Sequence, residues 1–322
     1  MKKRDLLVIP VFIPHEGCPY RCSFCNQLKI TGVHIQSDEM AINKAIESYL
    51  NIFKSNDFPK KREVAFYGGS FTGLELERQK HLINAVQPWI SSGQINSIRV
   101  STHSLLVNQN NISLLKNNGV KVVELGVQST NDAVLKSVGR PCNLQTVKSA
   151  VKIIRDNELI FMESVNDVID LKPDFVRIYP TLVIKNTELF EMYKSGNYVP
   201  WSLDRMIELV KNSLIAFHKA DIPVIRVGLH ADPSMLENFV EGPYHPSFRY
   251  LVDRLIARDK MFELLNLLQD LPKTITFRVP SRHVSLYLGH KKDNILAIKK
   301  KFGIQHIIFK QIDNQEGLEL VA

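Results

Sequence analysis

The chain has 322 residues, of which 44% are hydrophobic and 23% are charged, as in an ordinary globular protein. No apolar run approaches the roughly eighteen residues that a membrane-spanning helix needs, so we expect no membrane partner. The net charge of +8 permits a polyanionic partner such as RNA without requiring one.

The first residues are basic, and the apolar run after them is broken by Pro10 and Pro14. Without a small-residue cleavage site, this segment is better interpreted as a buried first strand than as a signal peptide. Of the four cysteines, three lie within residues 18–25 and Cys142 lies alone, which is not a disulfide framework for so long a chain. We therefore expect a cytoplasmic protein in a reducing compartment.

Short β-rich runs alternate with amphipathic helical stretches, a pattern typical of βα units around a parallel sheet. Residues 6–13 are almost wholly apolar and so suit a strand that is buried on both faces. The further strands predicted in this part are 63–67, 97–101, 120–127, 175–179 and 224–229. The helices predicted between them are 38–53, 75–89, 108–117, 130–137, 144–156 and 205–219.

Residues 157–174 are too few for a complete βα unit, which needs a strand, a helix and two loops. A fifth strand at residues 159–162 would therefore be abbreviated. Turn residues at 231–233 and 242–246 mark a boundary, and residues 230–322 are predicted to form a small C-terminal α/β appendage. Its predicted helices are 247–268 and 294–302, and its predicted strands are 274–279, 306–310 and 318–321.

Cys18, Cys22 and Cys25 lie in one polar loop after the first predicted strand, separated by three and then two residues. Three thiolates this close can bind a 4Fe-4S cluster and leave one iron open. We hypothesise that the open iron binds S-adenosylmethionine. A structural zinc site is the alternative, and it needs a fourth ligand. The residues that could supply this ligand are His15, His34 and Cys142.

Gly68, Gly69 and Ser70 directly follow the second predicted strand. Glycines at the carboxyl end of a parallel strand let a ligand approach the backbone closely. We expect this turn to hold the methionyl amino group of the cofactor through backbone carbonyls. Phe24, just before the third cysteine, fits packing against adenine or shielding the cluster, and equally fits a local hydrophobic anchor.

Glu124, Gly126 and Gln128 share one face of the fourth predicted strand, because side chains alternate along a strand. We expect them to line a barrel interior, with Glu124 and Gln128 as cofactor contacts. In the alternative interpretation, both are core polar groups satisfied by neighbouring backbone. Arg140 follows Gly139 and is either another cofactor contact or a surface arginine.

Three segments together resemble the radical S-adenosylmethionine (radical SAM) superfamily, in the branch that contains the catalytic subunit of Elongator. They are the cysteine loop with Phe24, residues 68–72 (Gly-Gly-Ser-Phe-Thr) and residues 124–129 (Glu-Leu-Gly-Val-Gln-Ser). The resemblance runs from about residue 6 to residue 229. Residues 175–228 and the tail look like the short bacterial members that lack the acetyltransferase domain.

This resemblance implies the α/β class, with a partial TIM-like (βα)6 barrel over residues 1–229 whose fifth βα unit is abbreviated. It implies a 4Fe-4S cluster on the three loop cysteines and S-adenosylmethionine held at its methionyl part by Gly68, Gly69 and Ser70. Gln128 and Arg140 would face the ribose and carboxylate of this cofactor. The implied activity is formation of a 5′-deoxyadenosyl radical that modifies tRNA or a small molecule, with flavodoxin or ferredoxin as electron donor.

Two departures from the family pattern bear on activity. Cys142 stands where the family commonly has a histidine, and residues 157–174 contain no Gly-Leu-Pro-Gly turn. The wall around the cofactor is therefore predicted to be incomplete. A second hypothesis is a catalytically weakened iron–sulfur or RNA-binding protein that retains the cluster loop. The basic runs 290–292 and 299–301 fit a phosphate-binding patch or a solvated helix face.

Overall fold

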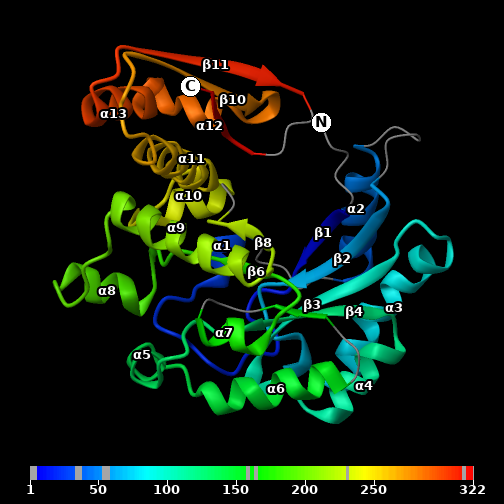
Figure 1. Cartoon of the computed structure of the whole chain (residues 1–322). Coiled ribbons are helices and arrows are strands. Elements are labelled where there is room, and N and C mark those ends of the chain that lie inside the picture. The colour runs from blue at the N-terminus through cyan, green and yellow to red at the C-terminus, as the bar shows by residue number, and fades with distance from the viewer. Residues whose placement is uncertain are drawn as a thin grey trace. The chain divides into compact units, whose positions relative to one another are not determined.

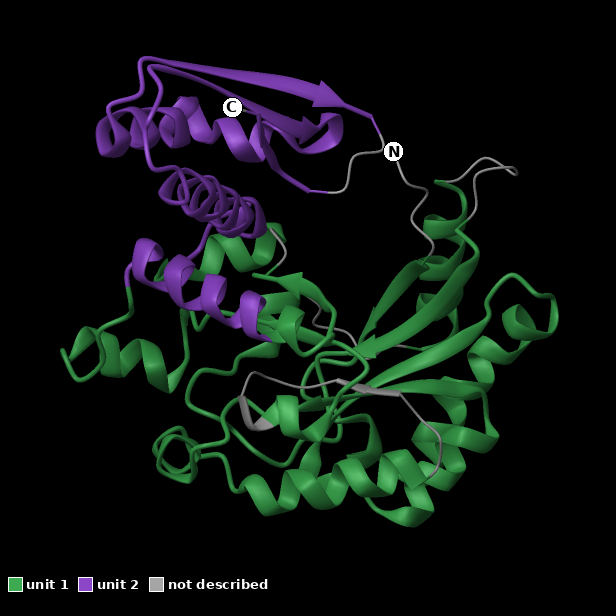
Figure 2. Cartoon of the chain, viewed as in Figure 1, with its two compact units in different colours: residues 1–201, 217–243 green, residues 202–216, 244–322 purple. Residues whose placement is uncertain are grey.

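The computed structural model describes residues 6–32, 38–52, 59–156, 160–162, 166–229, 232–313 and 317–321. The chain forms two compact units (Figure 2): unit 1 comprises residues 1–201 and 217–243, and unit 2 comprises residues 202–216 and 244–322. The division predicted from the sequence, into a partial barrel over residues 1–229 and a C-terminal appendage over residues 230–322, stays a prediction.

Unit 1 is built on a parallel sheet of five strands in the order β1-β2-β3-β4-β5 (Figure 1). The strands are β1 (Leu6–Phe12), β2 (Lys61–Tyr67), β3 (Ser97–His103), β4 (Val120–Gly126) and β5 (Ile160–Met162). Each strand pairs in parallel with the next one along the chain. The α/β class and the parallel sheet predicted from the sequence are therefore confirmed.

Helices connect these strands. They are α1 (Gln27–Thr31), α2 (Glu39–Leu50), α3 (Leu76–Ser91), α4 (Gln109–Asn117), α5 (Asp132–Ser137) and α6 (Leu144–Asp156). Leu82 and Val86 of α3 and Val147 and Ile154 of α6 join strand residues in one hydrophobic core. The side chain of Asn108 begins α4 by accepting a hydrogen bond in a capping box, so the sequence itself sets where this helix starts.

A second parallel sheet in unit 1 consists of β6 (Val176–Ile178) and β8 (Val224–Val227). Within the described residues β6 does not pair with β5, so no strand pairing joins the two sheets. Residues 157–159 and 163–165 of the predicted short unit lie outside the described residues, and its abbreviation stays a prediction.

The other elements are α7 (Asn166–Leu171), β7 (Val183–Ile184), α8 (Glu188–Lys194), α10 (Pro233–Asn238) and β9 (Phe239–Glu241), while α9 (Leu203–Lys219) is divided between the units.

Charged side chains from four strands form one buried network in unit 1. The Arg99 guanidinium donates from Nη2 to Oε2 of Glu63 at 2.6 Å and from Nη1 to Oε1 of Glu124 at 2.9 Å. Arg177 contacts the other oxygen of Glu124 at 3.1 Å and donates to the Tyr67 hydroxyl at 2.7 Å. Tyr67 donates in turn to Oε1 of Glu124 at 2.9 Å. Two arginines and two glutamates thus neutralise one another inside the unit.

This network joins the two sheets, because Arg177 lies on β6 and its partner Glu124 lies on β4. Burial alone would lower the pKa of both arginines, but the neighbouring glutamates more than offset it and the pKa of each is raised. Burial and the Glu124 carboxylate raise the pKa of Tyr67, which therefore stays a neutral hydrogen-bond donor. The partners hold their charges because each ion is paired.

Unit 2 contains a three-stranded sheet in the order β11-β10-β12, formed by β10 (Thr274–Pro280), β11 (His306–Ile312) and β12 (Glu319–Val321). Strand β11 pairs with β10 in parallel and β12 pairs with it antiparallel. The helices are α11 (Phe248–Asn266), α12 (Val284–Leu288) and α13 (Asp293–Phe302). Met261, Phe277 and Ile298 lie in a hydrophobic core of this unit. The helices and strands predicted for residues 247–321 are present.

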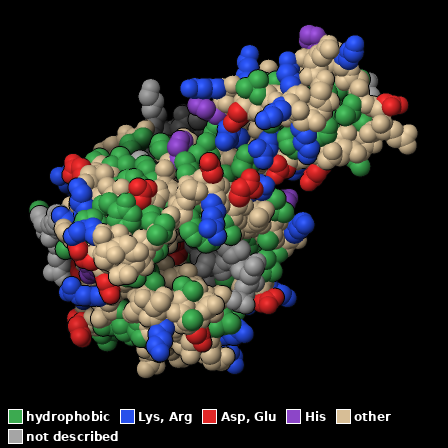
Figure 3. Space-filling model, turned by 90° about the vertical axis from the view of Figure 1, so that its left-hand side faces the viewer, with side chains coloured by type: hydrophobic (Ala, Val, Ile, Leu, Met, Phe, Trp, Pro, Cys, Tyr) green, Lys and Arg blue, Asp and Glu red, His purple; other side chains and the backbone are tan. Residues whose placement is uncertain are grey.

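No helix in the described part of the chain is both long and apolar enough to cross a membrane. On the face shown in Figure 3, Lys and Arg side chains are interspersed with Asp and Glu side chains. The positive net charge is therefore not gathered into a single patch on this face.

We expect Arg99→Met to lower the free energy of unfolding by about 3–5 kcal/mol, because it leaves the buried Glu63 carboxylate without its cation. Urea denaturation followed by circular dichroism measures this loss. The matched control is Lys194→Met, which breaks the exposed pair with Glu191 and should cost less than about 1 kcal/mol. A cost for Arg99→Met as small as that of the control would contradict a structural role for the network.

Candidate cofactor site

The cysteine loop leaves the end of β1 and is tied to the turn that follows β2. The backbone N–H of His15 donates to the carbonyl of Gly68 at 2.8 Å, and the N–H of Ser70 donates to the carbonyl of Glu16 at 2.9 Å. Both segments follow the carboxyl ends of parallel strands, which lie at one edge of the sheet. The structure thus places the two predicted motifs side by side.

Two segments that are distant in sequence hold the middle of the loop. The N–H of Ser23 donates to the carbonyl of Val138 at 3.0 Å, and the N–H of Leu189 donates to the carbonyl of Ser23 at 2.8 Å. Val138 directly follows α5, and Leu189 lies in the first turn of α8. The position of the cysteines therefore depends on contacts from both of these helices.

All three cysteines of the loop have free thiols; Cys22 is buried, and Cys18 and Cys25 are half-buried. In the described part of the chain, no three His, Cys, Asp or Glu side chains are grouped as the ligands of a single metal ion would be. A cluster differs in this respect, because each thiolate binds a different iron atom and the sulfur atoms need not approach one point.

Two nitrogen atoms lie close to the cysteine sulfurs. Nη1 of Arg140 is 3.6 Å from Sγ of Cys22, and Nε2 of Gln27 is 3.5 Å from Sγ of Cys25. Burial raises the pKa of the Cys25 thiol, and the hydrogen bond from Gln27 acts in the opposite direction. Hydrogen bonds to sulfur are among the interactions that tune iron–sulfur clusters. The residues present therefore fit a cluster-binding loop.

Glycines allow the cysteine loop to pack directly on the turn after β2. A methyl group at Gly69 would lie 2.5 Å from the carbonyl oxygen of Ile13, and one at Gly73 would overlap the carbonyl oxygen of Gly17. These obstacles are backbone atoms, which cannot move aside as a flexible side chain can. Gly68 has a φ of 86°, a conformation that favours glycine. The fold itself thus requires these glycines, and their contact with a cofactor stays a prediction.

Gln128 lies two residues beyond the end of β4 with a φ of 72°, and its side chain is exposed. Side chains alternate between the two faces of the sheet only as far as Gly126, where β4 ends. The alternation therefore does not determine the direction of the Gln128 side chain. Nε2 of Gln128 and Nη2 of Arg140 both approach Gly126, and Arg140 donates to the carbonyl of that glycine. Of the other predicted site residues, Ser70 is buried and Phe24 is half-buried.

Glu124 lies in the buried network, where protein donors occupy both of its carboxylate oxygens. Arg99 and Tyr67 donate to Oε1, and Arg177 contacts Oε2. A contact with the cofactor would come in addition to these three partners. The role of Glu124 at the cofactor stays a prediction.

His103 is a residue of this edge that the sequence did not single out. It ends β3, is 3% exposed, and packs against Tyr20 of the cysteine loop with ring centres 4.7 Å apart. Its Nδ1 accepts a hydrogen bond from Leu105, so the proton sits on Nε2, which has no partner among the described residues. Burial and the nearby Arg140 lower the pKa of His103 to about 3. The sequence feature that could have identified His103 is its position near the carboxyl end of a predicted strand.

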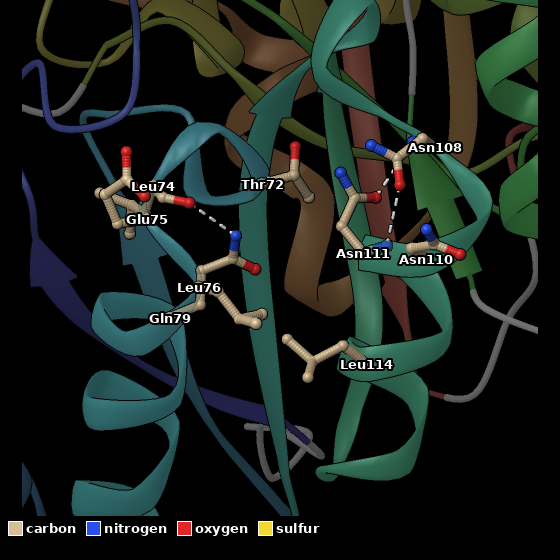
Figure 4. Close-up of a pocket in the computed structure, with 9 residues that line it drawn as sticks. All are labelled: Thr72, Leu74, Glu75, Leu76, Gln79, Asn108, Asn110, Asn111 and Leu114. Atoms are coloured by element: carbon tan, nitrogen blue, oxygen red, sulfur yellow. Dashed lines mark hydrogen bonds between the residues drawn. The ribbon is translucent and has the colours of Figure 1, made fainter.

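A cavity of about 440 Å³ lies between the first turns of α3 and α4 (Figure 4). Thr72 reaches it from the turn after β2, and Asn108 and Asn111 line it from the start of α4. Gln79 of α3 donates from Nε2 to the carbonyl of Leu74 at 2.8 Å. None of the predicted site residues lines this cavity, so it is separate from the predicted cofactor site.

Comparison with known families gives two matches. The sequence matches the Radical SAM superfamily over residues 12–173 and the Radical SAM C-terminal domain over residues 173–258. The first match begins at the end of β1 and contains the cysteine loop, the turn after β2 and all other predicted site residues.

Two curated proteins illustrate the similarity. The chain is 25% identical over 259 residues to the tRNA uridine(34) acetyltransferase of Methanocaldococcus jannaschii, covering 63% of this chain and 47% of that protein. It is 24% identical over 190 residues to Elongator complex protein 3 of Bos taurus, covering 48% of this chain and 35% of that protein. The chain therefore spans less than half the length of either relative.

Among solved structures, the chain is similar to the archaeal Methanocaldococcus infernus Elp3 with an N-terminal deletion. The TM-score is 0.58 at 20% identity, and the similarity covers 80% of this chain and 63% of that one. This likeness concerns the fold and supports an α/β partial barrel.

We expect Gly69→Ala and Gly73→Ala each to lower the free energy of unfolding by about 1–3 kcal/mol, because the added methyl group overlaps backbone atoms of the cysteine loop. Thermal and urea denaturation measure the loss. The control is Gly93→Ala, where nothing lies within 4 Å and only the φ of 73° opposes a side chain. Equal losses in all three variants would contradict the close packing of loop and turn.

Proposed function

The chain belongs to the radical SAM superfamily and is a radical SAM enzyme, and we propose that Cys18, Cys22 and Cys25 bind its 4Fe-4S cluster and that its substrate is a tRNA. When bound, such a cluster supplies one electron for the reductive cleavage of S-adenosylmethionine, which yields the 5′-deoxyadenosyl radical. The protein residues would hold and orient the two cofactors and exclude water from them.

The observation that carries the cluster assignment is the environment of the cysteine sulfurs. Arg140 lies 3.6 Å from Sγ of Cys22 and Gln27 lies 3.5 Å from Sγ of Cys25, so N–H groups are already placed beside two of the three sulfur atoms. The loop also follows the carboxyl end of β1, the edge where ligands bind in parallel α/β folds. Both facts support a loop built to carry an anionic centre.

We assign S-adenosylmethionine to the same edge. Gly68, Gly69 and Ser70 would offer backbone groups to its methionyl part. Gln128 and Arg140, whose side-chain nitrogens both lie near Gly126, would face its ribose and carboxylate.

Phe24 and Glu124 are the two further residues predicted to contact the cofactor. Phe24, within the loop, would pack against the adenine or shield the cluster. Glu124 is engaged by three protein donors, and we propose that it holds β4 in place as well as lining the interior.

The finer description of the barrel is also part of the proposal. We infer six βα units of which the fifth is abbreviated, because residues 157–174 are too few for a complete unit. A short fifth unit would leave the wall around the cofactor incomplete and lower its affinity. An external one-electron donor of the flavodoxin or ferredoxin class would reduce the cluster.

Two observations support tRNA as the substrate class. The names of the relatives include a tRNA uridine(34) acetyltransferase, although the similarity spans less than half of that protein. In addition, Lys and Arg outnumber Asp and Glu among residues 244–322. Excess positive charge favours binding to the phosphates of a nucleic acid.

We expect the anaerobically reconstituted protein, reduced with dithionite, to convert S-adenosylmethionine to 5′-deoxyadenosine. Cys22→Ser should lose the visible absorbance of the cluster and this activity, because one of the three ligands is removed. The matched control is Cys142→Ser, which changes a buried cysteine outside the loop and should retain both. A Cys22→Ser protein that kept a full cluster would refute the assignment, and a loaded wild-type protein that released no 5′-deoxyadenosine would favour the weakened iron–sulfur protein.

We expect binding to unmodified tRNA to weaken steeply as the salt concentration rises. A plot of log affinity against log salt concentration should fall with a slope of about 0.9 per neutralised phosphate. Replacing the exposed Lys299 and Lys300 of α13 by Ala should reduce this slope by about 2. Filter binding at several salt concentrations measures it. Replacement of Lys80 and Lys194, two lysines paired with glutamates, is the control of equal charge. Salt-independent binding would contradict a phosphate interface. Equal slopes for the Lys299/Lys300 variant and the control variant would indicate that the basic run 299–301 is a solvated helix face.

A further inference from the structure

Arg140 is a buried cation beside the cysteine loop. The residue as a whole is 7% exposed. Nη1 lies 3.6 Å from Sγ of Cys22, and Nη2 donates to the carbonyl of Gly126 at the end of β4. Two different segments therefore hold the guanidinium, and its orientation toward the sulfur is fixed by the strand edge.

No carboxylate among the described residues pairs with Arg140. Buried Arg99 and half-buried Arg177 differ in this respect, because both contact Glu124. A buried charge without a counter-charge is unfavourable, so the site around Arg140 favours an anion. The sulfur of Cys22 is the nearest candidate, since cysteine binds iron as the thiolate.

We propose that Arg140 raises the reduction potential of the cluster held by Cys18, Cys22 and Cys25, and that the carbonyl of Gly126 positions it to do so. This inference rests on the proposed function, because it presupposes the cluster. One-electron reduction by an external donor breaks no bond and adds one negative charge to the cluster and its thiolates.

The direction of the effect follows from electrostatics. A permanent cation and an N–H donor at Cys22 both stabilise the more negative, reduced state. The interaction is stronger in a buried site than in water, because the surroundings screen charge less. Hydrogen bonds to the sulfurs and the net charge of the site are recognised determinants of cluster potentials.

Gln27 offers an internal comparison within the same loop. Its Nε2 lies 3.5 Å from Sγ of Cys25, a distance similar to that between Arg140 and Cys22, but the amide is neutral. Gln27→Ala removes a hydrogen bond alone, whereas Arg140→Met removes a hydrogen bond and a charge. We expect both changes to lower the potential, with the larger effect at Arg140.

The experiment is a redox titration of the reconstituted full chain, followed by the electron paramagnetic resonance signal of the reduced cluster. S-adenosylmethionine is left out, so that any contact between Arg140 and the cofactor carboxylate cannot contribute. At the wild-type midpoint potential, Arg140→Met should lower the ratio of reduced to oxidised cluster about tenfold, which corresponds to about 59 mV for one electron. Arg140→Lys keeps the charge and should shift the ratio less.

The matched control is Arg62→Met, which removes the same charge near the amino end of β2. There the guanidinium donates to the carbonyls of Pro59, Gly93 and Gln94. The reduction potential of the cluster in Arg62→Met should equal that in the wild type. If Arg140→Met does not retain a cluster, Arg140→Gln decides the question with the same expected direction.

An unchanged potential in the neutral Arg140 variant, or an equal shift in Arg62→Met, would overturn the inference. A wild-type chain that binds no cluster would overturn both the inference and the proposed function. A loaded wild type with an unaltered potential in the Arg140 variants would overturn the inference alone.

Discussion

Unit 1 depends on the pairing of buried Arg99 and half-buried Arg177 with two buried glutamates, Glu63 and Glu124. Within the described residues no strand pairing connects the five-stranded sheet to the β6–β8 pair, and Arg177 makes the connection by contacting Glu124. Arg99 joins the same glutamate to Glu63, so the ions on β2, β3, β4 and β6 require one another. Because removal of one charge leaves another buried without a partner, the arrangement fixes the relative positions of these strands. It also anchors β4, at whose end Gly126 meets Arg140.

The cysteine loop, by contrast, is positioned mainly through backbone groups. Its base exchanges hydrogen bonds with the turn after β2, and Ser23 is held by Val138 and Leu189. Gly69 and Gly73 bring loop and turn into contact that a side chain would prevent. A loop with few apolar side chains obtains its shape in this way from the elements around it, and the placement of the three thiols follows from the placement of β1, β2, α5 and α8.

The electrostatic character of the site follows from the donors that the fold leaves at this edge. His103 is neutral because burial and Arg140 lower its pKa to about 3, and it keeps an N–H without a partner in the described residues. Arg140 and Gln27 add N–H groups beside two sulfur atoms. Donors that have no carboxylate partner among the described residues favour an anion, which supports the proposed thiolate-bound cluster at this edge. The cavity between the first turns of α3 and α4 is not lined by these groups.

The sequence by itself determined the α/β class, the order of the main strands and helices, and the cysteine and glycine motifs, because hydrophobic periodicity and residue spacing are local properties. It predicted β3 only as far as Ser101, and His103 at the true end of that strand was missed. Only the tertiary structure decided that Glu124 is shared by three protein donors and that Arg140 meets Cys22. These contacts join residues that are far apart in the chain, 118 positions in the case of Arg140 and Cys22, and no local pattern specifies which distant side chains will meet.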